Sequence, residues 1–505
     1  MTVNKRHVRQ IALLCAVGVA LAAGIVLVWP GSRQAIFHGS TNANQAQSSS
    51  GPAKPVFVGW SNPAMMGKPY GTKVNGVLTF RGNPTRTYYG TGPIPRTTPR
   101  ELWRFPKSGG LCAISSDAEG PREWCGNGWT GQPAVFERNG RTWLVVGAYD
   151  RNVHFLDAMT GEKILPSFPT GDIIKGSVTI DPDGFPLVYT GSRDNYYRVI
   201  AIDGDKPREL WKLSAKAVSP TLWNDDWDGS GLILDDYLFE GGENSQFHIV
   251  KLNRAYDANG KVTVSPKLVF NAPGWDDQLL KDLGDKNVSI ESSVTIVGNT
   301  VYFANSGGLV QGWDISGLKE GKAPQRVFRF WTGDDTDGTI TADDEGMLYV
   351  GAEYERLTTA SKNNGQMMKL DPKRPDNPLI WKVDDRNKSS STKGGIYGSA
   401  GIYKDLVIWG TDKGDVIGVD RATGAVRWRI ALHRVHMSPV IIDGVMVVGD
   451  CNGLLNAYDI TDTKAQPKQL WSIKPSACIE STPSVWNGTL YFGTRGGAIH
   501  AIGLK

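Results

Sequence analysis

IESSVTI at residues 290–296 and IESTPSV at residues 479–485 are two copies of a short pattern that recurs through the chain. The pattern is an apolar residue, a variable residue, Gly or Ser, and then usually Ser or Thr, before a run that leads to another apolar residue. Spacings of about 40 to 60 residues between copies are typical of the blades of a β-propeller. The other copies are WTGQPAV (129–135), IKGSVTI (174–180), WDGSGLI (227–233), TDGTITA (336–342), IYGSAGI (396–402) and VHMSPVI (435–441).

Further apolar runs follow most copies, such as LVYTGSRD (187–194) and LYFGTRGG (490–497). They are short, rich in Val, Ile, Tyr and Trp, and separated by Gly, Asp and Asn, as in strands joined by tight turns. No sustained 3.6-residue apolar period indicates a helix after the N-terminus. We therefore predict an all-β fold in which each blade has four antiparallel strands, A to D.

The last copy is followed by only two more runs before the chain ends at Lys505. ELWRF at residues 101–105 precedes the first copy and carries the Trp that is expected of a fourth strand. We expect this N-terminal strand to complete the last blade, because closing the ring removes exposed sheet edges. The prediction is an eight-bladed β-propeller over residues 101–505, which is one closed domain.

The N-terminal region carries a candidate membrane segment. Residues 11–29 are apolar, and basic residues lie within the preceding segment 1–10. Nineteen apolar residues are long enough to span a bilayer, and the basic flank is expected to stay cytoplasmic. A cleaved signal peptide is the alternative, with Ala20-Leu21-Ala22 as the cleavage site. In both cases we expect the propeller to be extracytoplasmic, and the anchor interpretation predicts a single-pass protein of the cell membrane.

Two segments separate this anchor from the ring. Residues 30–59 include the stretch HGSTNANQAQSSSGPAKP (38–55), which is rich in Ser, Gln and Pro and predicts a flexible tether. Residues 60–100 are rich in Pro and Gly and have too few strand signals to form a domain. We expect this irregular lead segment to wrap on the ring.

Four cysteines follow the membrane segment, namely Cys112, Cys125, Cys451 and Cys478. An even number in an oxidising compartment favours two disulfides. Cys112 and Cys125 share the loop before blade one, while Cys451 and Cys478 lie in neighbouring loops of blades seven and eight. We predict the pairs Cys112–Cys125 and Cys451–Cys478. Free buried thiols are the alternative, and the absence of a CxxC spacing argues against a zinc site.

The variable residue of each copy occupies the same place in every blade. A strands line the axis of a propeller, so we expect these eight side chains to form a ring at the mouth of a central channel. Four carboxylates repel one another unless a cation or a lysine compensates. A hard cation such as Ca²⁺ would do so through Asp228, Glu291 and Asp337; a solvated polar funnel or an organic ligand are the alternatives. The eight residues are Thr130, Lys175, Asp228, Glu291, Asp337, Tyr397, His436 and Glu480.

A second acidic element overlaps this ring. WNDDWDGSG places Asn224, Asp226 and Asp228 at alternate positions before Gly229, as in the first half of a calcium-binding loop, with Asp235 at the twelfth position. An ordinary Asx-rich turn is the alternative.

The turns between strands B and C add charged residues of both signs on the same face. Such turns form salt bridges with one another or present a polar surface to a protein partner. These residues are Asp150, Arg151, Arg193, Asp194, Glu243, Glu353, Arg356, Asp412, Asp450 and Arg495.

Charge and motifs exclude several classes of function. The net charge is +4, part of it beside the membrane segment, and the soluble part has no basic stripe that would bind nucleic acid. The chain also lacks a P-loop, a GxGxxG after a strand and a Ser-His-Asp order.

Three stretches resemble the A-x-D-x-x-T-G-x-x-x-W repeat of the quinoprotein-like, or PQQ-repeat, eight-bladed propellers. They are GVDRATGAVRW (418–428), FLDAMTGEKI (155–164) and NAYDITDT (456–463). The resemblance covers roughly residues 75–505 and implies the fold, but folds of this kind carry several functions.

One branch of that family comprises dehydrogenases that bind pyrroloquinoline quinone (PQQ) and Ca²⁺ at the channel mouth. By resemblance, the quinone would contact Lys175, Glu291, His436 and Glu480, and Asp337 would be the base that takes a proton from an alcohol or a sugar. The chain lacks the adjacent Cys-Cys pair that is common in the alcohol dehydrogenases, and it has no CxxCH for haem.

The other branch resembles the scaffold lipoprotein of the outer-membrane barrel-assembly machine and binds partner proteins without a cofactor. A membrane tether and long blade insertions favour this branch. The leading hypothesis is therefore a binding scaffold whose partner is an envelope or cell-surface protein, and the dehydrogenase is the alternative.

Overall fold

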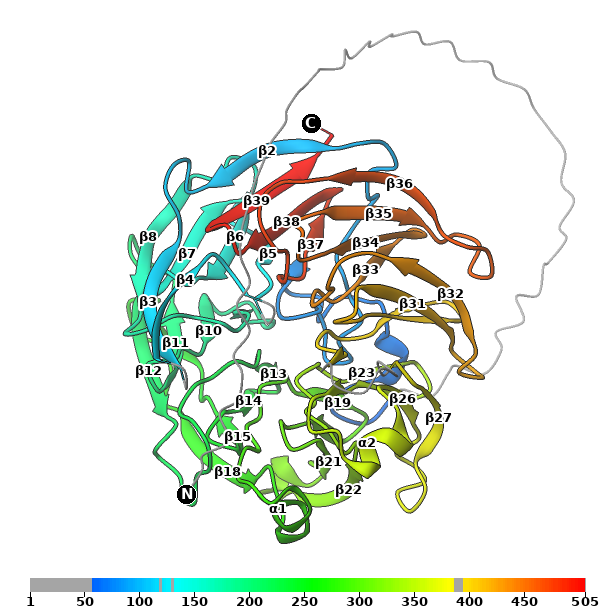
Figure 1. Cartoon of the computed structure of the whole chain (residues 1–505). Helices are drawn as coiled ribbons and strands as arrows, with labels where there is room; N and C mark the ends of the chain where they lie inside the picture. Colours follow the sequence, from blue (N-terminus) through cyan, green and yellow to red (C-terminus); the bar gives the residue numbers. More distant parts are fainter. Residues whose placement is uncertain (1–56, 118–119, 129–130, 386–393, 505) are drawn as a thin grey trace, which may run out of the picture.

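Eight antiparallel sheets surround a common axis in the computed structural model, which describes residues 57–117, 120–128, 131–385 and 394–504 (Figure 1). In each sheet the first strand lies nearest the axis and the fourth lies at the outside. This confirms the prediction of eight four-stranded blades.

Blade 1 consists of β5 (Ala134–Arg138), β6 (Arg141–Gly147), β7 (Asn152–Asp157) and β8 (Lys163–Pro169), and blade 2 of β9 (Thr179–Ile180), β10 (Leu187–Thr190), β11 (Tyr196–Ala201) and β12 (Arg208–Ser214). Blade 3 consists of β13 (Leu232–Leu234), β14 (Tyr237–Gly241), β15 (Gln246–Lys251) and β18 (Lys267–Pro273), and blade 4 of β19 (Thr295–Val297), β20 (Thr300–Phe303), β21 (Leu309–Asp314) and β22 (Gln325–Trp331).

Blade 5 consists of β23 (Thr341–Ala342), β24 (Leu348–Gly351), β26 (Met367–Leu370) and β27 (Leu379–Val383), and blade 6 of β29 (Gly401–Tyr403), β30 (Leu406–Gly410), β31 (Asp415–Asp420) and β32 (Val426–Ala431). Blade 7 consists of β33 (Val440–Ile442), β34 (Val445–Gly449), β35 (Leu455–Asp459) and β36 (Lys468–Ile473), and blade 8 of β37 (Ser484–Trp486), β38 (Thr489–Thr494), β39 (Ala498–Gly503) and β2 (Arg100–Phe105).

The ring closes through strand β2, as the sequence predicted. Strand β2 pairs antiparallel with β39, from Arg100 opposite Gly503 to Phe105 opposite Ile499. The indole of Trp103 donates a hydrogen bond to the carbonyl of Ala158 in blade 1, at 2.8 Å. The closing strand therefore joins the last blade and also contacts the first.

Short strands and helices lie outside the eight four-stranded blades. Strand β1 (Gly76–Val77) extends blade 1 by pairing with β5, and three two-stranded sheets lie in the loops. The helices α1 and α2 are too short to produce a helical period, so the sequence did not reveal them. The elements are β3 (Cys112–Asp117) with β4 (Gly120–Cys125), β16 (Ala255–Tyr256) with β17 (Val262–Thr263), β25 (Glu353–Tyr354) with β28 (Gly394–Gly395), α1 (Asp277–Leu283), α2 (Thr359–Asn364), η1 (Pro63–Met65) and η2 (Leu318–Glu320).

Packing between blades explains why the repeat has its particular residues. A Cβ on Gly176, at the third position, would lie 2.6 Å from the carbonyl oxygen of Asp228 in the next blade. The hydroxyl at the fourth position ties neighbouring blades together, because Ser293 Oγ accepts from the amide of Ser230 at 2.9 Å and Ser438 Oγ accepts from that of Ser399 at 2.8 Å. The small third residue and the hydroxyl at the fourth position are therefore explained by the close contact between neighbouring blades.

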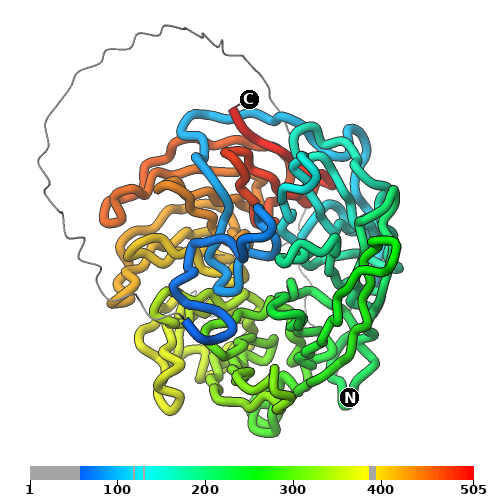
Figure 2. Tube along the Cα trace, turned by 180° about the vertical axis from the view of Figure 1, so that it is seen from behind, coloured from blue at the N-terminus to red at the C-terminus, as the bar shows by residue number. Residues whose placement is uncertain are grey.

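The lead segment closes one end of the axis. Arg81 and Arg86 have no exposed surface. Arg81 donates to the carbonyl of Ala400 at 2.6 Å, and Arg86 donates to those of Ser230 and Val294 at 2.7 and 2.6 Å. Figure 2 shows this part of the chain, in blue, lying across the centre of the ring when the molecule is seen from behind. Residues 78–90, which we call the plug, thus bind blades 3, 4 and 6 from the axis.

The predicted membrane segment, residues 11–29, lies outside the described residues, as do residues 1–10 and most of the predicted tether. Among the residues that the structure describes, no helix has the length and apolar character needed to cross a bilayer.

Candidate functional site

The predicted ring of side chains surrounds the end of the axis opposite the plug. Thr130 lies outside the described residues. Of the other seven, Lys175, Asp228, His436 and Glu480 are buried, and the remaining three are half-buried. Several are in direct contact in ring order: Lys175 pairs with Asp228, and His436 lies against both Tyr397 and Glu480. The structure therefore brings these side chains together at one mouth.

Lys175 is enclosed by acidic groups from blade 3. Its Nζ forms an ion pair with Asp228 and lies 2.8 Å from Glu243 Oε1 and 3.7 Å from Asp226 Oδ2. Arg193 Nε lies 2.5 Å from the same Asp226 oxygen. All three carboxylates are at most 3% exposed. Lys175 and Arg193 therefore compensate the charges of this cluster.

Burial and mutual repulsion govern ionisation in this cluster. Burial, with repulsion from Glu243, raises the pKa of Asp226 to about 6, and burial raises the pKa of Asp228 well above its usual value. Burial acts the same way on Glu243, but the charge of Lys175 and its hydrogen bond outweigh it, so the pKa of Glu243 is lowered. Below about pH 6 the cluster consequently holds its negative charge mainly on Glu243.

A second acidic group lies at blades 4 and 5. Glu291 Oε1 accepts hydrogen bonds from Ser289 at 2.7 Å and Ser306 at 3.0 Å, and Ser306 Oγ also lies 3.2 Å from Asp337 Oδ1. Burial, followed by repulsion from Glu243, raises the pKa of Glu291 to about 7. Burial, followed by repulsion from Asp335, raises the pKa of Asp337 well above its usual value.

The two predicted metal-ligand sets are arranged differently from the sequence expectation. Oxygen atoms come within 4.8 Å of one another in the groups Asp226–Asp228–Glu243 and Asp335–Asp337–Glu353, so Asp228 and Asp337 belong to separate groups and Glu291 to neither. Residues from the B–C turns, Glu243 and Glu353, complete each group.

The proposed calcium loop is likewise divided. Asn224 donates to Glu243 at 2.8 Å, while Asp226 and Asp228 contact Lys175. Asp235 lies after strand β13, where it forms an ion pair with Lys319. The chain continues as a strand after Gly231, which carries Asp235 away from the other three residues.

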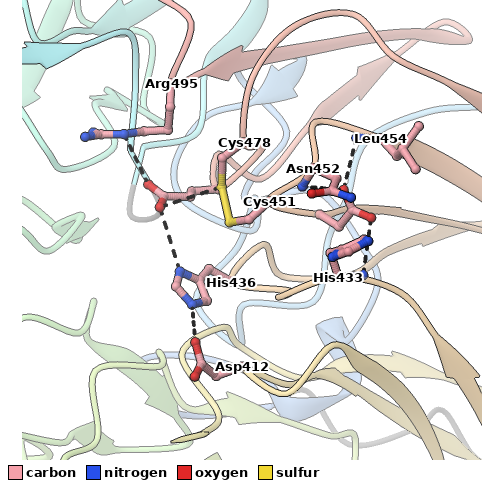
Figure 3. Close-up of a disulfide and its surroundings, with 10 residues drawn as sticks. Asp412, His433, His436, Cys451, Asn452, Leu454, Cys478 and Arg495 are labelled. Atoms are coloured by element: carbon pink, nitrogen blue, oxygen red, sulfur yellow. Dashed lines mark hydrogen bonds and ion pairs between the residues drawn. A yellow bond between two sulfur atoms is a disulfide. The ribbon is translucent and has the colours of Figure 1, made fainter. Parts of the chain in front are cut away.

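A chain of polar contacts crosses blades 6 to 8 (Figure 3). Asp412 Oδ1 lies 2.8 Å from His436 Nε2, His436 Nδ1 lies 3.7 Å from Glu480 Oε1, and Glu480 Oε2 lies 3.7 Å from Arg495 Nε. Burial lowers the pKa of His436, but hydrogen bonds with Asp412 and Glu480 outweigh burial and raise it. The disulfide Cys451–Cys478 lies beside this series of polar contacts.

Both predicted disulfides, Cys112–Cys125 and Cys451–Cys478, are present. The first links β3 and β4, and this hairpin brings Trp124 to the mouth, where its ring lies 5.2 Å from the guanidinium carbons of both Arg193 and Arg495. Trp124 was not among the predicted site residues, because nothing in the sequence of the loop indicated that it folds back as a hairpin.

A small pocket, with about 10 Å³ of space for water-sized molecules, lies between the mouth and the plug. Phe80 of the plug contributes to it, with Asp337 and Tyr397 at the mouth and hydroxyl groups of the repeat, including Ser293 and Ser438, along its wall. Phe80 was not predicted here, because the sequence did not place the lead segment on the axis.

Comparison with known proteins agrees with this architecture. The family model described as "Outer membrane protein assembly factor BamB" matches residues 370–505. Over this C-terminal part the chain is similar to the PQQ-like, BamB-type β-propellers. A curated relative of this type, the outer membrane protein assembly factor BamB of Nitrosomonas eutropha, is 29% identical over 167 residues, which are 32% of this chain and 35% of that protein. The match thus spans about a third of the relative's length.

Two solved structures share the fold of this propeller. The quinohemoprotein alcohol dehydrogenase of Comamonas testosteroni has a TM-score of 0.55 and 12% identity, covering 86% of this chain and 81% of its own. The computationally designed protein Ika8 has a TM-score of 0.50 and 14% identity, covering 75% of this chain and 98% of its own. At these identities the likeness concerns the fold alone.

Proposed function

We propose that this chain is a membrane-anchored, extracytoplasmic scaffold that binds an envelope or cell-surface protein at the mouth of its ring. The proposal rests on the observation that the cations at the mouth are already paired with carboxylates of the ring. Lys175 already contacts Asp226, Asp228 and Glu243, and Arg193 contacts Asp226. These cations hold the ring's own loops together. The similarity to a protein named as an assembly factor supports the same function.

The mouth fits the quinone of the dehydrogenase branch poorly. PQQ is a tricarboxylate, and its binding requires cations that are available to it. Among the described residues of the mouth, carboxylates outnumber cations, and the ammonium of Lys175 is enclosed by three of them. The pocket between the mouth and the plug, with about 10 Å³ of space, is also far below the roughly 300–1,000 Å³ of typical small-molecule sites.

One observation keeps the alternative, a PQQ- and calcium-dependent dehydrogenase, open to test. Asp335, Asp337 and Glu353 bring three oxygen atoms within 4.8 Å of one another, and carboxylate oxygens are the ligands that Ca²⁺ prefers. The protein should be incubated with PQQ and Ca²⁺ and assayed for bound quinone absorbance and for dye reduction with alcohols and aldoses. Turnover that Asp337→Asn abolishes would establish the dehydrogenase and overturn the scaffold.

The mouth face carries exposed apolar side chains that suit a protein partner. Trp223 is 51% exposed on the loop before blade 3 and has a φ of 69°, a strained conformation that is found most often at functional sites. Ile114, on the β3–β4 hairpin of the same face, is 54% exposed. Trp in particular dominates the binding energy of many protein interfaces.

The test is capture of an envelope protein by the purified full-length chain, followed by measurement of Kd for the captured protein. We expect Trp223→Ala to weaken binding by about 2 kcal/mol, or roughly 30-fold. Met159 is 66% exposed in the turn between β7 and β8 on the opposite face, so Met159→Ala is the matched control and should leave Kd unchanged. Equal Kd values for both variants would exclude the mouth face as the docking surface.

A further inference from the structure

Four side chains with nitrogen, oxygen and sulfur donors meet where blades 7 and 8 adjoin at the mouth (Figure 3). His436 lies on the loop that leads to blade 7, and Cys451 lies in the β34–β35 turn of that blade. Cys478 and Glu480 lie on the loop that leads to blade 8. One ligand atom from each of His436, Cys451 and Glu480 lies within 4.8 Å of the others. Cys478 is bonded to Cys451, so its sulfur belongs to the same cluster.

The separations in this cluster approach those of a tetrahedral metal site. Zinc bonds of about 2.0–2.3 Å place neighbouring ligand atoms about 3.3–3.8 Å apart. His436 Nδ1 lies 3.7 Å from Glu480 Oε1, and Cys478 Sγ lies 3.9 Å from the same oxygen. The two sulfur atoms are bonded to each other as a disulfide, so they are not available as two separate thiolate ligands. Breaking that bond lets them separate toward tetrahedral positions.

The surroundings already orient the imidazole for such a role. Asp412 Oδ1 lies 2.8 Å from His436 Nε2, which leaves Nδ1 facing Glu480 and the cysteines. A carboxylate on the outer nitrogen of a ligating histidine is the usual arrangement at zinc sites. Arg495, 3.7 Å from Glu480 Oε2, supplies positive charge beside the anionic ligands. His436, Cys478 and Glu480 are each at most 6% exposed, so the cluster is also sheltered from water.

We propose that Cys451, Cys478, His436 and Glu480 form a Zn²⁺ site that the Cys451–Cys478 disulfide masks and that reduction opens. Two thiolates with imidazole and carboxylate are ligands that Zn²⁺ prefers over harder divalent cations. The site is independent of the proposed scaffold function and of its docking surface.

The chemistry requires a dithiol donor, such as an exported thiol reductant. One donor thiolate attacks a sulfur of the Cys451–Cys478 disulfide, and the donor's second thiolate then resolves the mixed disulfide. Two electrons and two protons pass to Cys451 and Cys478, and the donor leaves as a disulfide. Zn²⁺ then binds and displaces both thiol protons. The covalent link between the two loops is thereby replaced by a metal link between the same residues.

The experiment uses the full-length chain in detergent with Co²⁺ as a visible probe of zinc sites. The oxidised protein and the protein reduced by a phosphine are titrated with Co²⁺, and free thiols are counted in parallel. We expect one tetrahedral Co²⁺ with thiolate-to-metal charge-transfer bands only after reduction, and its displacement by one equivalent of Zn²⁺. Asp412→Asn, which leaves all four ligands in place, should weaken Zn²⁺ binding by about 10- to 100-fold.

The second disulfide provides the matched control, since the cluster around it contains Glu123 but no histidine. The double variant Cys112→Ser/Cys125→Ser should bind Co²⁺ like the wild type, and Cys451→Ser/Cys478→Ser should not bind it. If either pair of substitutions prevents folding, His436→Asn, which keeps both disulfides, is tested instead. After reduction it should bind Co²⁺ at least tenfold more weakly than the wild type. The proposal is overturned if Cys451 and Cys478 resist reduction in the folded protein, if the reduced wild type shows no thiolate–cobalt bands, or if His436→Asn binds as tightly.

Discussion

Replacing Lys175 by methionine keeps the length of the side chain and removes the charge that Asp226, Asp228 and Glu243 share. Removing one partner of a buried ion pair costs about 3–5 kcal/mol, because the other charge stays buried without compensation. Arg193 still contacts Asp226, so we expect the lower part of this range.

This cost corresponds to a measurable change in thermal stability. The ring and plug comprise about 450 residues, and an unfolding entropy of about 2.1 cal/mol/K per residue gives about 0.9 kcal/mol/K. The lower part of the range, about 3–4 kcal/mol, therefore predicts that Lys175→Met lowers Tm by about 3–4 °C at pH 8. Lys216, whose side chain is 65% exposed and lies 2.7 Å from Asp225, is the matched control, and Lys216→Met should change Tm by less than about 1 °C.

The pH dependence gives the sign of the effect. The pKa of Asp226 is raised to about 6 and that of Asp228 is raised further above its usual value, chiefly by burial. Carboxyl groups with a raised pKa in the folded state stabilise it at low pH and lose that contribution as pH rises through the folded pKa. Without Lys175 their pKa values rise further, so the Tm deficit of Lys175→Met should shrink between pH 8 and pH 5.

Thermal unfolding followed by tryptophan fluorescence at pH 5, 6, 7 and 8 measures both effects. Adding Asp228→Asn to Lys175→Met should recover part of the lost Tm. A deficit no larger than that of Lys216→Met, or one of equal size at every pH, would refute the reasoning.

Three further substitutions test the packing of the ring. Arg81→Met should lower Tm by at least about 2 °C, because it leaves two buried carbonyls without a donor, each at a cost of about 1–3 kcal/mol. Thermal unfolding measures this shift, and Arg96→Ala, at an exposed site, is the control. Burial raises the pKa of Glu240 well above its usual value, so Glu240→Gln should raise Tm at pH 8 but not at pH 4, and an equal change at both would contradict the assignment. Gly176→Ala should cost about 1–3 kcal/mol in unfolding free energy because its Cβ meets a backbone oxygen at 2.6 Å, whereas Gly204→Ala, where no atom lies closer than 3.7 Å, should be tolerated.

The repeat predicted the fold well because each of its positions makes the same contact in every blade. The third position is small where the next inner strand lies against it, as at Gly176, and the fourth carries a hydroxyl that binds the next blade, as at Ser293. Such contacts recur at a regular spacing, so they are visible in one sequence. The closing strand and the Cys451–Cys478 disulfide were predictable from the order and alternation of strands, and the Cys112–Cys125 disulfide because both residues lie in one loop.

The plug and the pairing of the mouth residues were not predictable in this way. Arg81 binds the carbonyl of Ala400, and a backbone carbonyl leaves no signature in the sequence. At the mouth, the repeat indicated that Asp228 and Asp337 converge. It did not indicate that Asp228 groups with Glu243 and Asp337 with Glu353, because the direction of a turn's side chains depends on the local backbone.

The pairing of β2 with β39 also determines when this protein is able to fold. Phe105 finds its partner Ile499 only after about 400 further residues have left the ribosome, and contacts of such long range form slowly. Until then strand β2 has no strand to pair with. Loss of the final strand would leave an open ring with two bare edges, so a truncation of a few residues at the C-terminus is far more harmful than its length suggests.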